Sequence, residues 1–250
     1  MRTVVISGAS SGIGWATAQR FAAAGDHVVN LDPAEPTEPG PTTWMNVDVA
    51  DWAAVEQAVD EVHRSRGGLD VVIANAGISI RRGVLELTEA QARRICEVNL
   101  LGVLGLWQAA ARRMLPARRG VLLATASVNG HRGYPFYADY NATKAGVAAL
   151  CRTFALELSP YVRVACVTPG AVLTPMQRAE YTDQMLAEVN ERIPAGRHAD
   201  PSEIADAYFY LASDEARFIT GQEIIIDGGE TAGATTAILG AADRGQAPRP

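Results

Sequence analysis

Short apolar runs recur along the chain, and stretches with helical spacing separate them. The runs lie at residues 3–7, 27–31, 43–47, 69–77, 120–126, 162–167 and 223–227. The run L-D-V-V-I-A-N-A-G at residues 69–77 lacks polar alternation, which is typical of a parallel strand buried on both faces. Strands that alternate with helices predict a doubly wound α/β fold, in which a parallel seven-stranded sheet carries helices on both faces.

Helical segments are predicted from about residue 51, from 88 to 114, from about 138 and from 201 to 212. The last of these opens with Asp200 as its cap and Pro201 at its first position. Prolines punctuate a loop over residues 33–41, and the amphipathic segment 175–195 is suited to cover a cleft as a lid. We expect a single Rossmann domain over residues 1–230, followed by a small-residue-rich, partly disordered tail at 231–250.

Candidate site residues cluster where the predicted strands end. They are the glycine-rich residues 8–14, Asp32, residues 75–77, Ser127 and residues 169–174. In an open parallel sheet, ligands bind beyond the carboxyl ends of the strands. The convergence of these segments on one edge is the strongest indication of a binding site.

The first strand runs directly into a glycine-rich turn and a helix, with glycines at positions 8, 12 and 14. Helix N-terminal amides attract phosphate, and glycines let the backbone approach it. The spacing is G-x-x-x-G-x-G and differs from the G-x-G-x-x-G dinucleotide fingerprint, because residue 10 is serine. Taken alone, the turn is explained about as well by a purely structural role.

Asp32 follows the second strand, about twenty positions beyond the glycines. A carboxylate there accepts hydrogen bonds from the hydroxyls of an adenosine ribose and repels a 2′-phosphate. The turn carries Ser10 and Ser11 and no basic residue that would bind such a phosphate. We therefore expect NAD to be favoured over NADP, although an aspartate that merely starts a turn before Pro33 is the alternative.

Tyr140 is followed four residues later by Lys144, which is the only lysine in a chain with 21 arginines. Residues i and i+4 share one face of a helix, so both side chains can act on one ligand. A nearby ammonium favours a phenolate and lowers the tyrosine pKa toward the range of efficient proton transfer. Ser127, at the end of an apolar run, can hydrogen-bond the reacting oxygen. The structural alternative is a half-buried surface tyrosine and a serine that caps a loop.

Composition excludes several other classes of protein. A net charge of −6 without long basic runs argues against nucleic-acid binding. Cys96, Cys151 and Cys166 lack C-x-x-C spacing and indicate free thiols in a reducing compartment. The four histidines show no ligand spacing, so no metal site is expected. No signal peptide or apolar run of membrane-spanning length is present, and we expect a cytoplasmic protein without a membrane or nucleic-acid partner.

Together these motifs resemble those of the short-chain dehydrogenase/reductase family over about residues 3 to 230. S-G-A-S-S-G-I-G at residues 7–14 resembles the family's T-G-x-x-x-G-x-G turn, with Ser7 where threonine is usual. A-N-A-G at 74–77 resembles its N-N-A-G, with Ala74 in place of the first asparagine. Residues 169–174 and I-D-G-G at 226–229 match later family segments, while Asn99, Ser127, Tyr140 and Lys144 match its catalytic set.

The resemblance implies specific roles. Tyr140 would exchange the proton with the substrate oxygen, Lys144 would lower the tyrosine pKa and hold the nicotinamide ribose, Ser127 would orient the substrate, and Asn99 would anchor a relay water. Asp48 and Val49 would flank adenine, and Thr174 with the backbone near Val172 would hold the carboxamide. The cofactor-binding residues implied are Gly8, Ser11, Gly12, Ile13, Gly14, Asp32, Asp48, Val49, Asn75, Ala76, Gly77, Tyr140, Lys144, Pro169, Gly170, Val172 and Thr174.

The sequence thus predicts an NAD(H)-dependent oxidoreductase that interconverts a secondary alcohol and a ketone, with a homotetramer (or homodimer) implied by the resemblance. An NAD(P)H-dependent biosynthetic ketoreductase and a non-catalytic dinucleotide sensor are the alternatives. The polar and aromatic residues that could line the substrate pocket suit a polar or anionic substrate: Arg81, Arg82, Asn129, His131, Arg132, Tyr134, Phe136, Met176 and Tyr181.

Overall fold

The structure is a computed structural model that describes residues 1–36 and 40–233. Seven parallel strands form one sheet in the order β3-β2-β1-β4-β5-β6-β7, which confirms the predicted doubly wound fold. Of the tail predicted at 231–250, residues 234–250 lie outside the described residues. The strands are β1 Thr3–Ser7, β2 His27–Leu31, β3 Thr42–Met45, β4 Val71–Ala74, β5 Val121–Thr125, β6 Arg163–Pro169 and β7 Gln222–Ile226.

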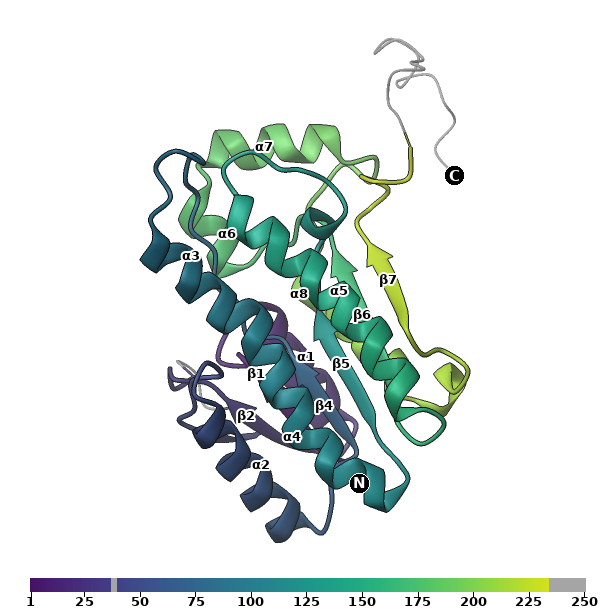
Figure 1. Ribbon diagram of the computed structural model, residues 1–250. Coiled ribbons are helices and arrows are strands. Elements are labelled where there is room, and N and C mark those ends of the chain that lie inside the picture. Colours follow the sequence, from purple (N-terminus) through teal and green to yellow (C-terminus); the bar gives the residue numbers. More distant parts are fainter. Residues whose placement is uncertain (37–39, 234–250) are drawn as a thin grey trace, which may run out of the picture.

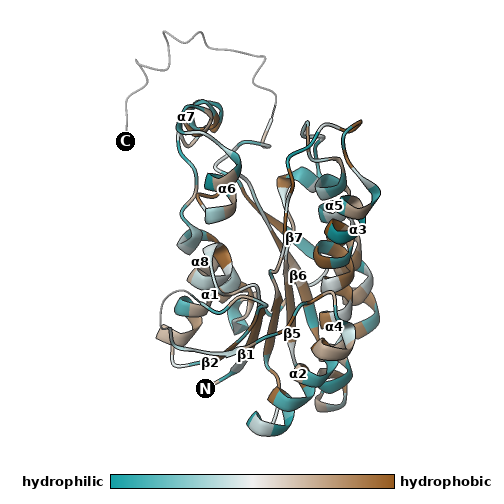
Figure 2. Ribbon diagram, turned by 90° about the vertical axis from the view of Figure 1, so that its left-hand side faces the viewer, coloured by the Kyte–Doolittle hydropathy of each residue, from teal (hydrophilic) through white to brown (hydrophobic). Residues whose placement is uncertain are grey.

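Helices cover both faces of the sheet (Figure 1). Figure 2 shows the sheet nearly edge-on, with α1 and α8 on one side and α2, α4 and α5 on the other. Two apolar clusters fill these layers, one on each side of the strands. The helices are α1 Gly12–Ala23, α2 Trp52–Arg66, α3 Glu89–Cys96, α4 Gly102–Ala117, α5 Ala138–Leu158, α6 Pro175–Glu180, α7 Asp183–Arg192 and α8 Pro201–Leu211.

The bounds of β3 to β7 differ from the prediction by one to three residues, and the ends of β4 and β6 have clear causes. β4 stops at Ala74, three residues early, because the amides of Asn75 and Ala76 turn away from the sheet and each donate to Ser7 Oγ at 3.1 Å. β6 continues to Pro169, whereas its predicted end is residue 167. A proline at the last position is compatible with pairing because the Gly170 amide donates to the Ile226 carbonyl at 2.9 Å.

The long helix predicted over residues 88–114 is in fact three segments. A π-helical turn, Glu97–Leu101, separates α3 from α4. The widened turn contains Asn99, which is fully buried. Such turns often mark functional sites in helices.

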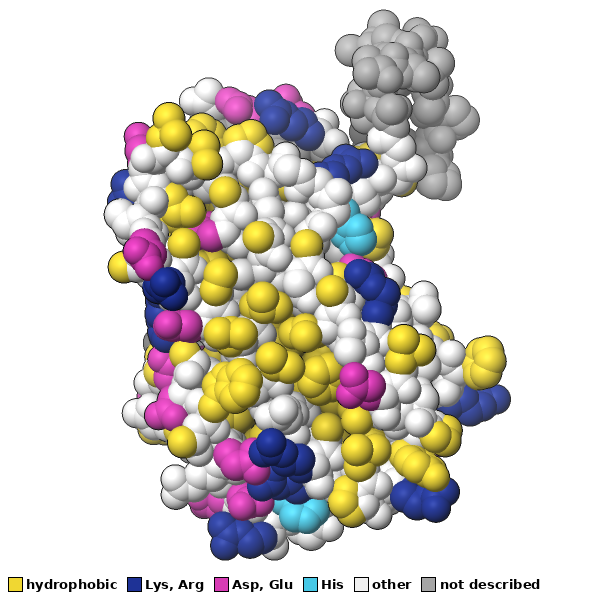
Figure 3. All heavy atoms as spheres, in the orientation of Figure 1, with side chains coloured by type: hydrophobic (Ala, Val, Ile, Leu, Met, Phe, Trp, Pro, Cys, Tyr) yellow, Lys and Arg dark blue, Asp and Glu magenta, His cyan; other side chains and the backbone are white. Residues whose placement is uncertain are grey.

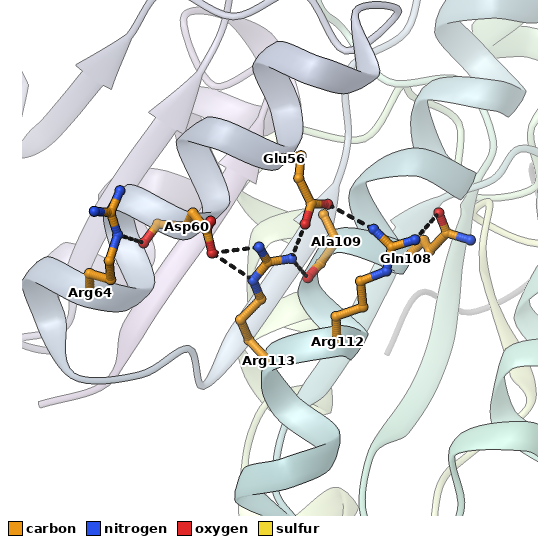
Figure 4. A network of polar contacts seen from close by, with 7 residues as sticks. All are labelled: Glu56, Asp60, Arg64, Gln108, Ala109, Arg112 and Arg113. Carbon is orange, nitrogen blue, oxygen red and sulfur yellow. Dashed lines mark hydrogen bonds and ion pairs between the residues drawn. The ribbon is translucent and has the colours of Figure 1, made fainter.

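An ion-pair network joins α2 to α4 on the outer surface (Figure 4). Arg113 of α4 contacts Glu56 and Asp60 of α2, each at 2.5 Å, and its side chain is 12% exposed. The network joins the two helices side by side on one face of the sheet.

The predicted lid at 175–195 contains two short helices, α6 and α7, beyond the carboxyl ends of the strands (Figure 1). Thr174 and Thr182 start them, each accepting a hydrogen bond from an amide of the first turn. No helix in the described part of the chain is long and apolar enough to cross a membrane.

Candidate active site

A cavity of about 320 Å³ lies at the carboxyl ends of β1, β2 and β4. Its walls come from eight segments of the chain, between residues 8 and 176. Thirteen residues predicted for cofactor binding line it: Gly8, Ser11, Gly12, Ile13, Asp32, Asp48, Val49, Asn75, Ala76, Gly77, Tyr140, Lys144 and Thr174. The fold therefore brings most of the predicted set together.

The first turn of α1 faces this cavity without a side-chain cap. Ser11 occupies the cap position, yet its side chain makes no hydrogen bond to the following amides among the described residues. By contrast, Asp51, Thr88 and Asp200 cap α2, α3 and α8. Uncapped first-turn amides and the positive end of the helix dipole favour an anionic group such as a pyrophosphate.

Gly8 and Gly14 allow close packing in the turn. Gly8 has φ +70, and a Cβ there would lie 2.7 Å from Ala76 Cα. A Cβ on Gly14 would lie 2.1 Å from the Gly8 carbonyl oxygen. Glycine at this position therefore lets α1 pack directly against the turn. Gly14 itself does not line either of the two cavities described here.

Asp32 points into the cavity while fixing the turn around it. Its two carboxylate oxygens accept hydrogen bonds from the Ser10 amide at 3.2 Å and the Ala34 amide at 2.9 Å. Each oxygen has a second lone pair, which can accept a further hydrogen bond. Position and charge therefore suit a ligand that offers hydroxyl groups.

Asp48 is paired with Arg94 of α3 at 2.6 Å, and both side chains line the cavity. Burial raises the pKa of Asp48, but hydrogen bonds from the Ala50 amide and Arg94, together with the Arg94 charge, leave it below its usual value. Arg94 was not predicted as a site residue, because its partner Asp48 lies 46 residues away in the chain. Asp48 neutralises this arginine at the cavity wall.

A buried polar network ties the glycine turn to the end of β5. Asn75 Nδ2 donates to the carbonyl oxygens of Ser7 and Gly8, and Thr125 Oγ1 lies 2.9 Å from Asn75 Oδ1. Tyr208 of α8, fully buried, places its hydroxyl 2.7 Å from Thr125 Oγ1. Lys144 Nζ donates to the Thr125 carbonyl at 2.7 Å. Thr125 contacts the predicted site residues Asn75 and Lys144, and Tyr208 contacts Thr125. Local sequence patterns indicate neither of them.

Tyr140 and Lys144 lie on one face of α5 as predicted, with Nζ 5.4 Å from the centre of the phenol ring. The predicted lowering of the tyrosine pKa is wrong for this arrangement. Burial raises the pKa of Tyr140 to about 12, against a lowering contribution from the Ser127 hydrogen bond. Burial also lowers the pKa of Lys144 to about 8, and its ammonium is directed at a backbone carbonyl.

Ser127 and Asn99 have structural partners as well. The Ser127 hydroxyl accepts the Asn129 amide at 3.2 Å, so it caps the short helical turn that follows while lining a second cavity. Asn99 Oδ1 accepts the Ile78 amide and Nδ2 donates to the Ile78 carbonyl, both at 2.8 Å. Both hydrogen bonds place the π-helical turn against the segment after β4.

The second cavity, of about 420 Å³, lies under α6 and α7 and meets the first at Tyr140 and Met176. Six residues predicted for the substrate pocket line it: Arg81, Asn129, Tyr134, Phe136, Met176 and Tyr181. Arg82, His131 and Arg132 do not. His131 instead contacts Glu223 at 2.9 Å, and Arg132 donates to the carbonyls of Glu230 and Thr231.

Three predicted cofactor residues also lie outside the first cavity. Pro169 ends β6, Gly170 lines the second cavity, and Val172 is buried in the core. The Val172 carbonyl accepts the Thr174 amide at 2.8 Å. Within residues 1–36 and 40–233, no cluster of three or more His, Cys, Asp or Glu side chains could hold a metal ion.

The residues of the first cavity fit a dinucleotide. The uncapped start of α1 suits the pyrophosphate, Asp32 suits ribose hydroxyls, and Gly8 and Gly77 keep backbone accessible. A Cβ on Gly77 would lie in ordinary van der Waals contact with Asn99 Oδ1 at 3.5 Å and Lys144 Nζ at 3.6 Å, so this glycine lies directly beside both side chains.

Comparisons with known proteins agree with this geometry. A family model described as enoyl-(acyl carrier protein) reductase matches residues 8–231. A cis-4-hydroxycyclohexanecarboxylate dehydrogenase from Sinomonas cyclohexanicum is 38% identical over 242 residues, covering 92% of this chain and 97% of the relative. A 3-oxoacyl-(acyl-carrier-protein) reductase from Thermotoga maritima is 35% identical over 243 residues, covering 91% and 97%.

A solved structure shares the whole architecture. It is a short-chain type dehydrogenase/reductase from Mycobacterium marinum, with a TM-score of 0.87, 31% identity, and coverage of 93% of this chain and 96% of that one. The family match, the relatives and the sheet order all indicate the same family. The chain belongs to the short-chain dehydrogenase/reductase family of oxidoreductases.

Proposed function

We propose that this protein is an NAD(H)-dependent oxidoreductase that interconverts a secondary alcohol and a ketone. The observation that carries the proposal is the position of Tyr140, which lines both the cavity whose residues fit a dinucleotide and the cavity under the lid. Hydride transfer needs substrate, cofactor and proton donor at one point. A bound nicotinamide supplies the hydride chemistry.

The side chains around Tyr140 have complementary tasks. In the oxidative direction the Tyr140 oxygen accepts the proton of the substrate hydroxyl, and in the reductive direction it donates one to the carbonyl oxygen. Ser127 orients that oxygen by hydrogen bonding. Lys144 holds the nicotinamide ribose and supplies positive charge beside the phenol, and Asn99 anchors a water on the path of the proton to solvent.

The preference for NAD rests on the charges of the first cavity. Asp32 presents a carboxylate where the adenosine ribose would lie. Among the described residues that line this cavity, the basic ones are Arg94, which is paired with Asp48, and Lys144 beside Tyr140. A 2′-phosphate would therefore meet a negative charge near Asp32.

The substrate we infer is polar or anionic. The second cavity is lined by charged side chains of both signs, two arginines and three glutamates, and by several hydroxyl groups. Arg81 and Arg192 could bind an anionic group, and the relative from Sinomonas cyclohexanicum is named for a substrate that carries both a hydroxyl and a carboxylate. Equal turnover of a hydroxy acid and a bulky hydrocarbon alcohol contradicts this inference.

Two further properties belong to the proposal. We place the protein in the cytoplasm, supported by free thiols at Cys96, Cys151 and Cys166. We also propose a homotetramer (or homodimer), supported by hydrophobic side chains that gather over the middle of the face formed by α4 and α5 (Figure 3). Leu156 of α5 is exposed, as are Leu101 in the π-helical turn before α4 and Trp52 at the start of α2.

A biosynthetic ketoreductase that uses NADPH is the second candidate, favoured by the relative from Thermotoga maritima. A dinucleotide sensor, the candidate from a different class, has no need of a proton donor between two cavities. The reductase differs from the main proposal in its cofactor and in the direction of the reaction in the cell.

Titration of the purified protein with NADH and separately with NADPH tests the cofactor, with tryptophan fluorescence or calorimetry as readout. We expect tighter binding of NADH, and we expect Asp32→Asn to reduce the difference while a Glu35→Gln control leaves it unchanged. Tighter binding of NADPH contradicts the role of Asp32 and favours the reductase. A panel of secondary alcohols with NAD⁺ then identifies turnover, and binding without any turnover favours the sensor.

A further inference from the structure

Glu180, the last residue of α6, joins three segments at the edge of the substrate cavity. Ser79, after β4, donates its hydroxyl to one carboxylate oxygen at 2.5 Å. Tyr137, which precedes α5, donates to the other oxygen at 2.6 Å. The Tyr137 hydroxyl also lies 3.4 Å from that of Tyr181. One carboxylate thus connects the lid to both walls of the cavity.

Both hydrogen bonds use a charged acceptor, which makes them stronger than bonds between neutral groups. Tyr137 is only 8% exposed. Burial, followed by the hydrogen bond to Glu180, holds the pKa of Tyr137 far above its usual value, so the hydroxyl remains a donor. Tyr137 is therefore held as the donor in its hydrogen bond to the Glu180 carboxylate.

Glu180 also faces the catalytic tyrosine. It lines the same cavity as Tyr140, and the rings of Tyr137 and Tyr140 pack edge to face with their centres 6.1 Å apart. The Glu180 charge adds to the rise in the pKa of Tyr140 that burial causes. The other charged groups that face this region are Lys144 on α5, Arg81 after β4, Glu188 and Arg192 on α7, and Glu230 after β7.

We propose that Glu180 is a positioning residue, which fastens the lid across the substrate cavity and sets the negative charge that Tyr140 faces. The fastening follows from the hydrogen bonds alone. The effect on Tyr140 rests on the proposed function, because it concerns the proton of the reaction. The two parts can be measured separately.

Limited proteolysis tests the fastening without any turnover. Trypsin can cut after Arg178, which is exposed in α6. Glu180→Gln keeps the side-chain volume but has one acceptor oxygen for two donors, so cleavage after Arg178 should be at least about 5-fold faster than in the wild type, since a lost hydrogen bond to a charged group exceeds about 1 kcal/mol. Glu191→Gln, an exposed change on α7, is the control and should leave the cleavage rate unchanged.

Tyr137→Phe removes the same hydrogen bond from the opposite side. It should also accelerate cleavage, and the double variant should be less than additive because both changes remove one interaction. Equal cleavage of Glu180→Gln and the wild type, with unchanged melting temperature, overturns the proposal. Ser79→Ala, which leaves Tyr137 intact, provides a second test if Glu180→Gln does not fold.

The dependence of kcat on pH tests the effect on Tyr140. Removal of the Glu180 charge should lower the apparent pKa of the tyrosine, so the pH profile of Glu180→Gln should move to lower pH, with KM raised several-fold by the loosened lid. A purely structural residue would change KM or stability without moving the profile. If no alcohol is turned over, the proposed function fails while the proteolysis still decides the fastening.

Discussion

Lys144 differs from a surface lysine in its solvation and its partner. It is 3% exposed, and its ammonium donates to the Thr125 carbonyl. Burial lowers its pKa from 10.5 to about 8. The folded protein therefore releases this proton at a lower pH than the unfolded chain does.

This difference predicts how stability depends on pH. Between pH 8 and 10.5 the unfolded chain holds the Lys144 proton that the folded protein has lost, so unfolding becomes less favourable as pH rises through that range. Relative to Lys144→Met, the free energy of unfolding of the wild type should increase by on the order of 3 kcal/mol across this window. Urea unfolding of both proteins at several pH values measures it, and parallel curves contradict it.

Local sequence patterns identify site residues whose partners lie close to them in the chain. The spacing of Tyr140 and Lys144 and the position of Ser127 at a strand end were sufficient to place all three at one point. Glu180 and Arg94 were missed, because their partners lie 43 and 46 residues away and only the folded chain brings them together. The direction of the Tyr140 pKa was wrong because the sequence does not report burial.

At the scale of the element, the turn before α1 depends on close approach of backbone to backbone. Gly8→Ala introduces a Cβ 2.7 Å from Ala76 Cα in a residue with φ +70. The clash adds to the cost of roughly 1–2 kcal/mol for a side chain in the left-handed region. We expect a lower melting temperature and weaker NADH binding, measured by thermal unfolding and fluorescence titration.

Gly25 provides the matched control for this prediction. Its φ is +85, and a Cβ there would meet nothing within 4 Å. Gly25→Ala therefore has the backbone strain without the clash, and should be destabilised less than Gly8→Ala with NADH binding unchanged. Equal losses in both variants would mean that strain alone explains the requirement for glycine in the turn.

The π-helical turn depends on the amide of Asn99. Asn99→Leu leaves the part-buried amide and carbonyl of Ile78 without these partners, and an unsatisfied polar group costs roughly 1–3 kcal/mol when water cannot replace the partner. We expect the free energy of unfolding to fall by at least about 2 kcal/mol, with faster hydrogen exchange at Ile78. Gln57→Leu, an exposed change on α2, is the control. A loss as large in that variant contradicts the assignment.

Elements were predictable because apolar runs and caps are local, and every predicted strand is present. The break at Glu97–Leu101 was not, since an inserted residue in a helix leaves the apolar periodicity nearly intact. The exact ends of β4 and β6 depended on side-chain and turn hydrogen bonds made with other segments, Ser7 Oγ and the Ile226 carbonyl.

At the scale of the whole molecule, the face of α4 and α5 predicts self-association. Leu156 of α5 is 84% exposed. Leu156→Glu should shift the oligomer toward smaller species in light scattering, because it places a charge on an apolar contact. Leu85→Glu, at a residue 98% exposed before α3, is the control and should leave the mass unchanged. An unchanged mass for Leu156→Glu argues that this face is not the interface.

A chain with a single lysine, buried in the middle of α5, also carries its own reporter of unfolding. A protease that cuts only after lysine has one site, and cleavage gives fragments 1–144 and 145–250. In the native protein this bond is shielded, so the fragments should appear in urea with the same midpoint as the loss of helical circular dichroism. Reagents that acylate amines should likewise modify only the N-terminus until α5 opens, which gives the folded enzyme one defined point of attachment to a surface or a dye.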